Sequence, residues 1–152
     1  MTEEIKDKQR KRCIARLILE DLADWFGIEE SREQYIEECG EQIFVAAKRA
    51  GKEVGFISLK ETGKDTAEVA VMGVLRECHR CGAGKELMRA AKDVAAEKGY
   101  SFLQVKTVRT GIYEDYDKTN LFYRGVGFKE FEIFPSLWDE NNPCQIYVMA
   151  LK

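Results

Sequence analysis

The chain has 152 residues, of which 45% are hydrophobic and 34% charged, and its formal net charge is −3. This length suits one domain over residues 1–152 with a hydrophobic core of its own. The acidic balance argues against a nucleic-acid partner, and no apolar run approaches the roughly 20 residues of a membrane span.

The apolar periodicity predicts helices over residues 6–26 and 30–39, the second opening on a Ser31–Gln34 capping box. Strands are predicted over 42–48 and 53–60, joined by a glycine-containing turn, and over 66–75. A helix over 83–98 ended by Gly99, a strand over 102–108, a short helix over 119–125 and strands over 128–134 and 145–151 follow. This order predicts an α/β fold with a mixed sheet.

The predicted strand over 66–75 carries one polar residue on an otherwise apolar face. Side chains alternate along a strand, so Glu68 shares a face with Ala70, Met72 and Val74. A carboxylate at this position is either a solvated residue near the strand end or a functional group.

A turn rich in glycine and basic residues connects that strand to the helix over 83–98. Gly82 and Gly84 lie between Arg80 and Lys85, so the turn can present backbone N–H groups and positive charge to phosphate oxygens. A plain strand-to-helix connection, in which the glycines only relieve backbone strain, is the alternative.

The spacing around the turn excludes two nucleotide motifs. A Walker A loop would need glycine at His79 and Ser or Thr at Glu86. A dinucleotide fingerprint would need a third glycine at Leu87.

Two motifs resemble the GNAT superfamily of N-acetyltransferases. The pyrophosphate loop of that family reads Gln or Arg, two residues, Gly, one residue, then Gly or Ala; residues 79–84 read HRCGAG, with His79 in place of the usual Gln or Arg. Residues 123–128, YRGVGF, match the family's Tyr, three residues, Gly-Phe segment. The resemblance covers roughly residues 12–151 in element order.

The resemblance implies a mixed, mostly antiparallel central sheet flanked by helices, with a splayed parallel strand pair forming a coenzyme A cleft. Acetyl-CoA is the implied cosubstrate, and no metal is expected. Its pantetheine arm would pair with strand backbone and its pyrophosphate would bind N–H groups of the turn. The implied cofactor-binding residues are Met72, Gly73, Val74, His79, Arg80, Cys81, Gly82, Ala83, Gly84 and Lys85.

Acetyl transfer to an amine needs a neutral nucleophile and an acid for the departing thiolate. Tyr123 lies where the family usually has its acid, although it can equally be a core aromatic residue. Glu68 is the candidate base, acting through a water, because it precedes the first turn glycine by a spacing like that of the glutamate base in histone-acetylating members. The alternative for Glu68 is a solvated residue.

The residues Cys78-His79-Arg80-Cys81 raise the possibility of a redox or zinc site. A structural zinc site needs a second ligand pair, and His79 is the single histidine of the chain. The five cysteines have no repeated spacing, so we expect free thiols in a reducing compartment and a cytoplasmic protein.

The acceptor is the least defined part of the prediction. Two acidic and aromatic segments, residues 113–116 and 138–140, would suit a cationic amine or form solvated loops. We expect a primary amine of a small molecule or protein, no nucleic-acid or membrane partner, and a monomer or homodimer. The alternative function is a catalytically silent acyl-CoA-binding regulatory module.

Overall fold

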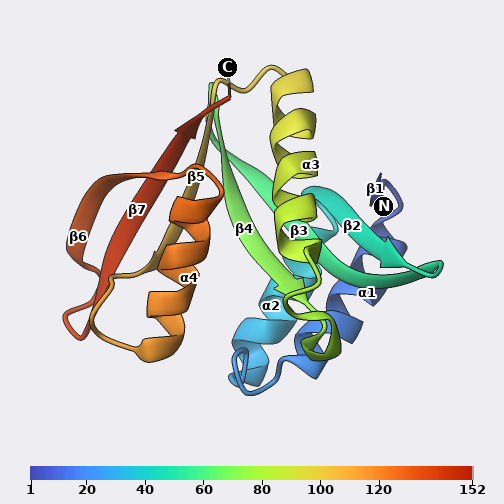
Figure 1. The fold of residues 1–152 in the computed structure, drawn as a ribbon, viewed down its shortest axis with the longest axis horizontal. Coiled ribbons are helices and arrows are strands. Elements are labelled where there is room, and N and C mark those ends of the chain that lie inside the picture. Colours follow the sequence, from blue (N-terminus) through green and yellow to red (C-terminus); the bar gives the residue numbers. More distant parts are fainter. Residues whose placement is uncertain (152) are drawn as a thin grey trace. The chain divides into compact units, whose positions relative to one another are not determined.

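The computed structural model describes residues 1–151, which form an α/β fold of helices and strands. Hydrogen-bonded strand neighbours follow the order β1-β2-β3-β4-β5-β7-β6 (Figure 1). Strands β4 and β5 pair in parallel, whereas β1–β2, β2–β3, β5–β7 and β6–β7 pair antiparallel. The predicted mixed, mostly antiparallel sheet is confirmed. The elements are β1 (Thr2–Glu4), α1 (Lys8–Asp21), α2 (Glu29–Cys39), β2 (Ile43–Arg49), β3 (Lys52–Gly63), β4 (Thr66–Val74), the 3-10 helix η1 (Arg76–Cys78), α3 (Ala83–Glu97), β5 (Phe102–Val108), α4 (Glu114–Gly125), β6 (Lys129–Asp139) and β7 (Asn142–Ala150).

The chain divides into two compact units, and strands β3 and β4 and helix α3 contribute residues to both. Unit 1 consists of Met1–Lys60 and Ala70–Val94; unit 2 consists of Glu61–Val69 and the residues from Ala95 onward. The expectation of a single domain stays a prediction. None of the helices within residues 1–151 is long and apolar enough to cross a membrane.

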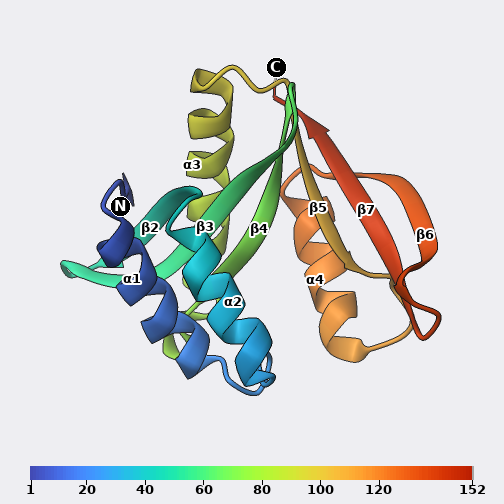
Figure 2. The ribbon, with the colours of Figure 1, turned by 180° about the vertical axis from the view of Figure 1, so that it is seen from behind.

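Unit 1 is held by apolar packing on both faces of its strands. Helices α1 and α2 lie side by side on one face (Figure 2), and α3 covers the other. The rings of Phe44 and Phe56 stack with centroids 5.0 Å apart in this core. Gly73 allows α1 to approach β4 closely, because a Cβ there would lie 3.1 Å from Ile18 Cγ2 and 3.2 Å from Leu22 Cδ1.

Several predicted boundaries in unit 1 are wrong. Helix α1 ends at Asp21, and Asp7 caps its N-terminus by accepting from the Arg10 N–H at 2.8 Å. Helix α2 has no side-chain cap because Ser31 lies inside the helix rather than before it, so the capping box is absent. Strand β1 was not predicted; it is three residues long and pairs with β2.

Strand β1 is fastened by charge, which makes its stability dependent on pH. Glu3 accepts from Arg10 Nη1 at 3.1 Å and pairs with Lys48 Nζ at 2.8 Å, and these partners lower the pKa of Glu3 from 4.5 to about 2. A carboxyl group whose pKa is lower in the folded than in the unfolded state stabilises the fold at pH values above its unfolded-state pKa. This stabilisation is lost as the pH falls through its folded-state pKa. We expect Glu3→Gln to lower the melting temperature at neutral pH but not near pH 2. An equal deficit at both pH values would contradict this.

Unit 2 is built around the antiparallel strands β5, β7 and β6, with α4 packed on β5. Strand β5 coincides with its prediction. Helix α4 begins at Glu114, so the expected loop before Thr119 is helical. The expected loop of residues 135–144 is also wrong, because Pro135–Asp139 belongs to β6 and Asn142–Cys144 to β7.

Candidate functional site: a glycine turn and two proton-transfer candidates

In unit 1 the glycine turn is built from two left-handed residues before helix α3. His79 has φ −63° and ψ 143°, Arg80 has φ +67°, and the Cys81 N–H donates to the Cys78 carbonyl at 3.3 Å. Gly82 has φ +85° and open space where a Cβ would stand. Helix α3 starts at Ala83, so its first N–H groups have no partner inside the helix, as at an anion-binding helix N-terminus.

Three cations beside this turn are available to a ligand. Arg80, Lys85 and Arg89 are exposed, and none forms an ion pair within residues 1–151. Arg76 differs, because its guanidinium is paired with Asp24 and its N–H donates to Asp21 at 2.8 Å. The turn therefore keeps a positive surface although the chain is acidic overall.

His79 fastens the turn to the end of β4. Its Nε2 lies 2.8 Å from the Val74 carbonyl, so this nitrogen carries the proton and donates. The predicted strand residues Met72 and Val74 are half-buried and Gly73 is buried. All ten predicted cofactor-binding residues belong to unit 1.

In unit 2 Glu68 is buried and forms an ion pair. It is 6% exposed, and Lys106 Nζ lies 2.8 Å from its Oε1. The pair arises from the parallel register Glu68↔Gln104, because Lys106 follows two residues later on the same face of β5. Glu68 is thus not the solvated residue of the alternative interpretation. Sequence reasoning missed Lys106, although it is the only charged residue of β5.

Tyr123 lies on α4 in unit 2 among aromatic rings. The centroids of Phe122 and Phe128 are each 5.7 Å away and that of Tyr147 is 6.1 Å away. Loss of solvent raises the pKa of Tyr123 from 10 to about 12, and Tyr116 adds to this shift. No hydrogen-bond partner for its hydroxyl is found within residues 1–151. The hydroxyl is therefore protonated at neutral pH and is available to donate a hydrogen bond to a ligand.

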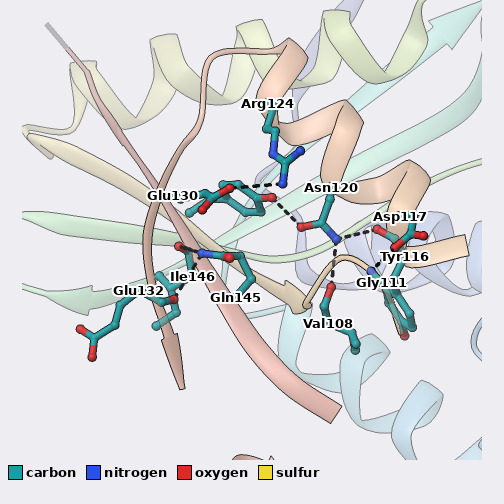
Figure 3. A network of polar contacts seen from close by, with 11 residues as sticks. Val108, Gly111, Tyr116, Asp117, Asn120, Arg124, Glu130, Glu132, Gln145 and Ile146 are labelled. Atoms are coloured by element: carbon teal, nitrogen blue, oxygen red, sulfur yellow. Dashed lines mark hydrogen bonds and ion pairs between the residues drawn. The ribbon is translucent and has the colours of Figure 1, made fainter. Parts of the chain in front are cut away.

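Asn120 anchors the helix that carries Tyr123 (Figure 3). It is 1% exposed and donates through Nδ2 to the carbonyls of Val108 at 2.9 Å and Tyr116 at 2.6 Å. Its Oδ1 accepts from the Tyr147 hydroxyl at 2.5 Å. The side chain therefore ties α4 to both β5 and β7, and sequence reasoning missed it.

Removing this amide should destabilise the protein. Asn120→Ala removes the amide that donates to the buried Val108 carbonyl and to the Tyr116 carbonyl and that accepts from the Tyr147 hydroxyl, so we expect a loss of about 2–3 kcal/mol in the free energy of unfolding. Urea unfolding measures the change. Thr119→Ala, at the half-buried neighbouring position, is the control and should change stability by less than about 0.5 kcal/mol, because the Thr119 hydroxyl makes one long, solvent-exposed hydrogen bond, to the Asp115 carbonyl at 3.3 Å. A loss at Asn120 no larger than at Thr119 would contradict the anchoring role.

The two acidic and aromatic segments occupy ordered elements of unit 2. Residues 114–116 open helix α4, and Trp138 lies on β6 with 47% of its surface exposed. Asp139 accepts from the Asn141 N–H at 2.8 Å and from Asn142 Nδ2 at 2.9 Å. Its carboxylate thus closes the β6–β7 turn.

The cysteines are free thiols, as predicted: Cys13 and Cys81 are exposed, Cys78 is half-buried, and Cys39 and Cys144 are buried. Within residues 1–151 no three metal-ligating side chains come together.

Comparison with known proteins places this geometry in one family. The model of the "Acetyltransferase (GNAT) family" matches residues 10–128. An acetyltransferase of that family from Desulfovibrio desulfuricans has 17% identity and a TM-score of 0.84, over 100% of this chain and 99% of that one. An aminoglycoside 6'-N-acetyltransferase from Enterococcus faecium has 19% identity and a TM-score of 0.76, over 100% and 97%.

A third similar structure is an aminoglycoside 6'-N-acetyltransferase complexed with coenzyme A, with 21% identity and a TM-score of 0.75 over 100% of this chain and 97% of that one. No curated protein matches the chain by sequence. The family match spans most of the chain and includes the glycine turn, β4, β5 and Tyr123. The chain therefore belongs to the GNAT family of acetyltransferases.

Proposed function

We propose that the protein transfers the acetyl group of acetyl-CoA directly to a primary amine of a small molecule or protein in a ternary complex. The observation that carries the proposal is the glycine turn before α3, where the helix N-terminus meets three cations that form no ion pair within residues 1–151. Pyrophosphate is the ligand such a turn suits, because it accepts several backbone hydrogen bonds and carries charge. We place the protein in the cytoplasm, as a monomer or homodimer without a nucleic-acid or membrane partner.

The donor would be held by residues of unit 1. Backbone groups of Met72, Gly73 and Val74 would pair with the pantetheine arm as an added strand does. Residues from His79 to Lys85 would hold the pyrophosphate, with N–H groups supplied mainly from Arg80 onward. His79 acts indirectly, because its Nε2 donates to the Val74 carbonyl.

Tyr123 would assist the departing thiolate. A phenol of pKa about 12 lies about 3.5 units above an ordinary thiol, so complete proton transfer is uphill by about 5 kcal/mol. Burial of the thiolate would reduce this gap. Tyr123 therefore acts first as a hydrogen-bond donor that stabilises the thiolate, and proton transfer completes as the thiol leaves.

Glu68 would remove the amine proton through a water. Its Oε1 accepts from Lys106 at 2.8 Å, which leaves Oε2 for that water. Lys106 positions the carboxylate through this ion pair.

Replacing Glu68 should change the pH dependence of the reaction. We expect Glu68→Gln to lower kcat/KM about 100-fold at pH 7. The deficit should shrink as pH approaches the amine pKa of about 10, where the substrate deprotonates unaided. Lys106→Met is the companion variant, because it disturbs the same ion pair but keeps the carboxylate. A deficit in Glu68→Gln that is constant with pH would contradict the role as base.

An acceptor screen tests the proposed function. Acetyl-CoA in excess should raise the melting temperature by mass action, and release of free thiol should then be followed across an amine panel. The panel begins with aminoglycosides, because two of the similar structures act on them, and continues with polyamines and peptide amines. Absence of a thermal shift contradicts both the enzyme and the silent acyl-CoA-binding module. A shift without thiol release from any amine supports the module.

A further inference from the structure

Two thiols lie at the ends of the turn that precedes Gly82. Cys78 closes η1, and Cys81 follows three residues later. The angles of His79 and the φ of Arg80 are those of a type II β-turn, in which the second central residue is left-handed. The long hydrogen bond of 3.3 Å from the Cys81 N–H to the Cys78 carbonyl closes it.

This turn has the backbone geometry that a disulfide needs. The first and fourth Cα atoms of a β-turn are less than about 7 Å apart. Disulfides join Cα atoms about 4.4–6.8 Å apart. The turn closed by the Cys81 N–H bond to the Cys78 carbonyl thus brings the two backbones within the range that a disulfide spans.

The surroundings of the two thiols differ, and this difference determines which thiol reacts first. Cys81 is exposed and Cys78 is half-buried. Burial raises the pKa of Cys78, and nearby Cys81 and Glu77 add to this shift, whereas Arg49 and Lys52 oppose it. Cys81 is thus the thiol that reacts first with a reagent from solvent, and Cys78 is the resolving thiol.

We propose that Cys78 and Cys81 form a reversible disulfide that weakens binding of acetyl-CoA to the glycine turn. The oxidant is a low-molecular-weight disulfide such as oxidised glutathione. The Cys81 thiolate attacks it and releases one glutathione thiolate; the Cys78 thiolate then attacks the Cys81 sulfur and releases the second. The two protons of the protein thiols end on the two glutathione thiols, so one disulfide is exchanged for another.

The disulfide affects binding through one hydrogen-bond donor. In the thiol form the Cys81 N–H is held only by a long bond and can turn to a phosphate oxygen. A sulfur–sulfur bond holds Cys81 against Cys78 and keeps this N–H on the Cys78 carbonyl. Loss of one donor to a charged oxygen weakens binding about tenfold. This coupling rests on the proposed function, whereas formation of the disulfide does not.

Thiol counting in glutathione redox buffers tests the disulfide. The full chain carrying Cys13→Ser removes the one exposed thiol outside the turn, and the remaining thiols, Cys39 and Cys144, are buried. We expect two thiols to disappear together, with a mass lower by two hydrogens and restoration by dithiothreitol. Cys78→Ser in the same background is the matched control, in which glutathione should remain attached to Cys81. Glutathione attached to Cys81 with Cys78 present would overturn the proposal.

Affinity measurements on both redox forms test the coupling. The oxidised form should bind acetyl-CoA about tenfold more weakly, and saturating acetyl-CoA should shift the thiol–disulfide midpoint toward the thiols by about 30 mV. Equal affinity of the two forms would overturn the coupling. If the reduced form fails to bind acetyl-CoA, the proposed function fails and takes the coupling with it, and thiol counting still decides whether the disulfide forms.

Discussion

Gly82→Glu is expected to abolish detectable acetyl-CoA binding. The residue has φ +85°, so a side chain strains the turn, and a carboxylate would stand at the proposed pyrophosphate site. Loss of two charge-assisted hydrogen bonds, each of about 1.5–3 kcal/mol, weakens binding at least about 100-fold. Isothermal titration calorimetry and the acetyl-CoA-induced rise in melting temperature measure the loss.

Gly51→Glu is the matched control for this variant. Gly51 has φ +78° and also has open space at the Cβ position, but it lies in the β2–β3 turn. The backbone strain and the added charge are therefore alike, and acetyl-CoA affinity should stay close to that of the native chain. If Gly82→Glu binds as tightly as Gly51→Glu, the glycine turn is not the pyrophosphate site.

Tyr123→Phe is expected to lower kcat about 100-fold or more while the KM for acetyl-CoA changes little, because the role proposed for the hydroxyl is to stabilise the departing thiolate. The raised pKa of Tyr123 also predicts how the activity depends on pH. A hydroxyl with a pKa of about 12 stays protonated through the working range, so activity should not fall with an apparent pKa near 10 because of this residue. Initial rates between about pH 6 and pH 11 for both chains test this.

Tyr147→Phe is the control that distinguishes a catalytic role of the Tyr123 hydroxyl from a role in packing of the aromatic cluster. The Tyr147 hydroxyl donates to Asn120, and its ring lies beside that of Tyr123. Its removal should lower the free energy of unfolding by about 1–2 kcal/mol and leave kcat nearly unchanged. Equal losses of kcat in the two variants would mean that Tyr123 acts only through the aromatic cluster.

The elements with strong local signals were predictable from the sequence. Helix α3 carries an apolar stripe and ends before Gly99, whose φ of +93° is typical of a helix stop. Strand β5 is rich in aromatic and β-branched residues: Phe102, Val105, Thr107 and Val108. The glycine turn was found because its residues must occupy fixed positions relative to one another.

Elements whose boundaries depend on tertiary contacts were not predictable. Pro135 and Pro143 indicate a loop, yet both lie in strands, where β6 is an edge and its register with β7 is interrupted between Phe134 and Asp139. The start of α4 had a usable signal, since Glu114, Asp115 and Asp117 place negative charge at a helix N-terminus. It was missed because the segment has few apolar residues.

Candidate site residues could be chosen from the sequence, but the contacts that they make could not. Glu68 was marked by its position on an apolar face, whereas its partner Lys106 lies 38 residues later and is brought to it by strand register. Asn120 had no distinguishing pattern, because its role depends on carbonyls and a hydroxyl from three other places in the chain. Spacing along a sequence cannot report such contacts.

Arg80 has a left-handed backbone conformation, which is unfavourable for arginine, and a charge beside the proposed pyrophosphate site. Replacing it with glycine should therefore raise the stability of the fold and lower the affinity for acetyl-CoA. Glycine would relieve the left-handed conformation at φ +67° but would remove one of the three free cations. A selection for thermal tolerance alone would therefore favour Arg80→Gly, and a selection for growth on limiting acetyl-CoA would retain arginine. Libraries screened only for expression will tend to drift away from the native residue here.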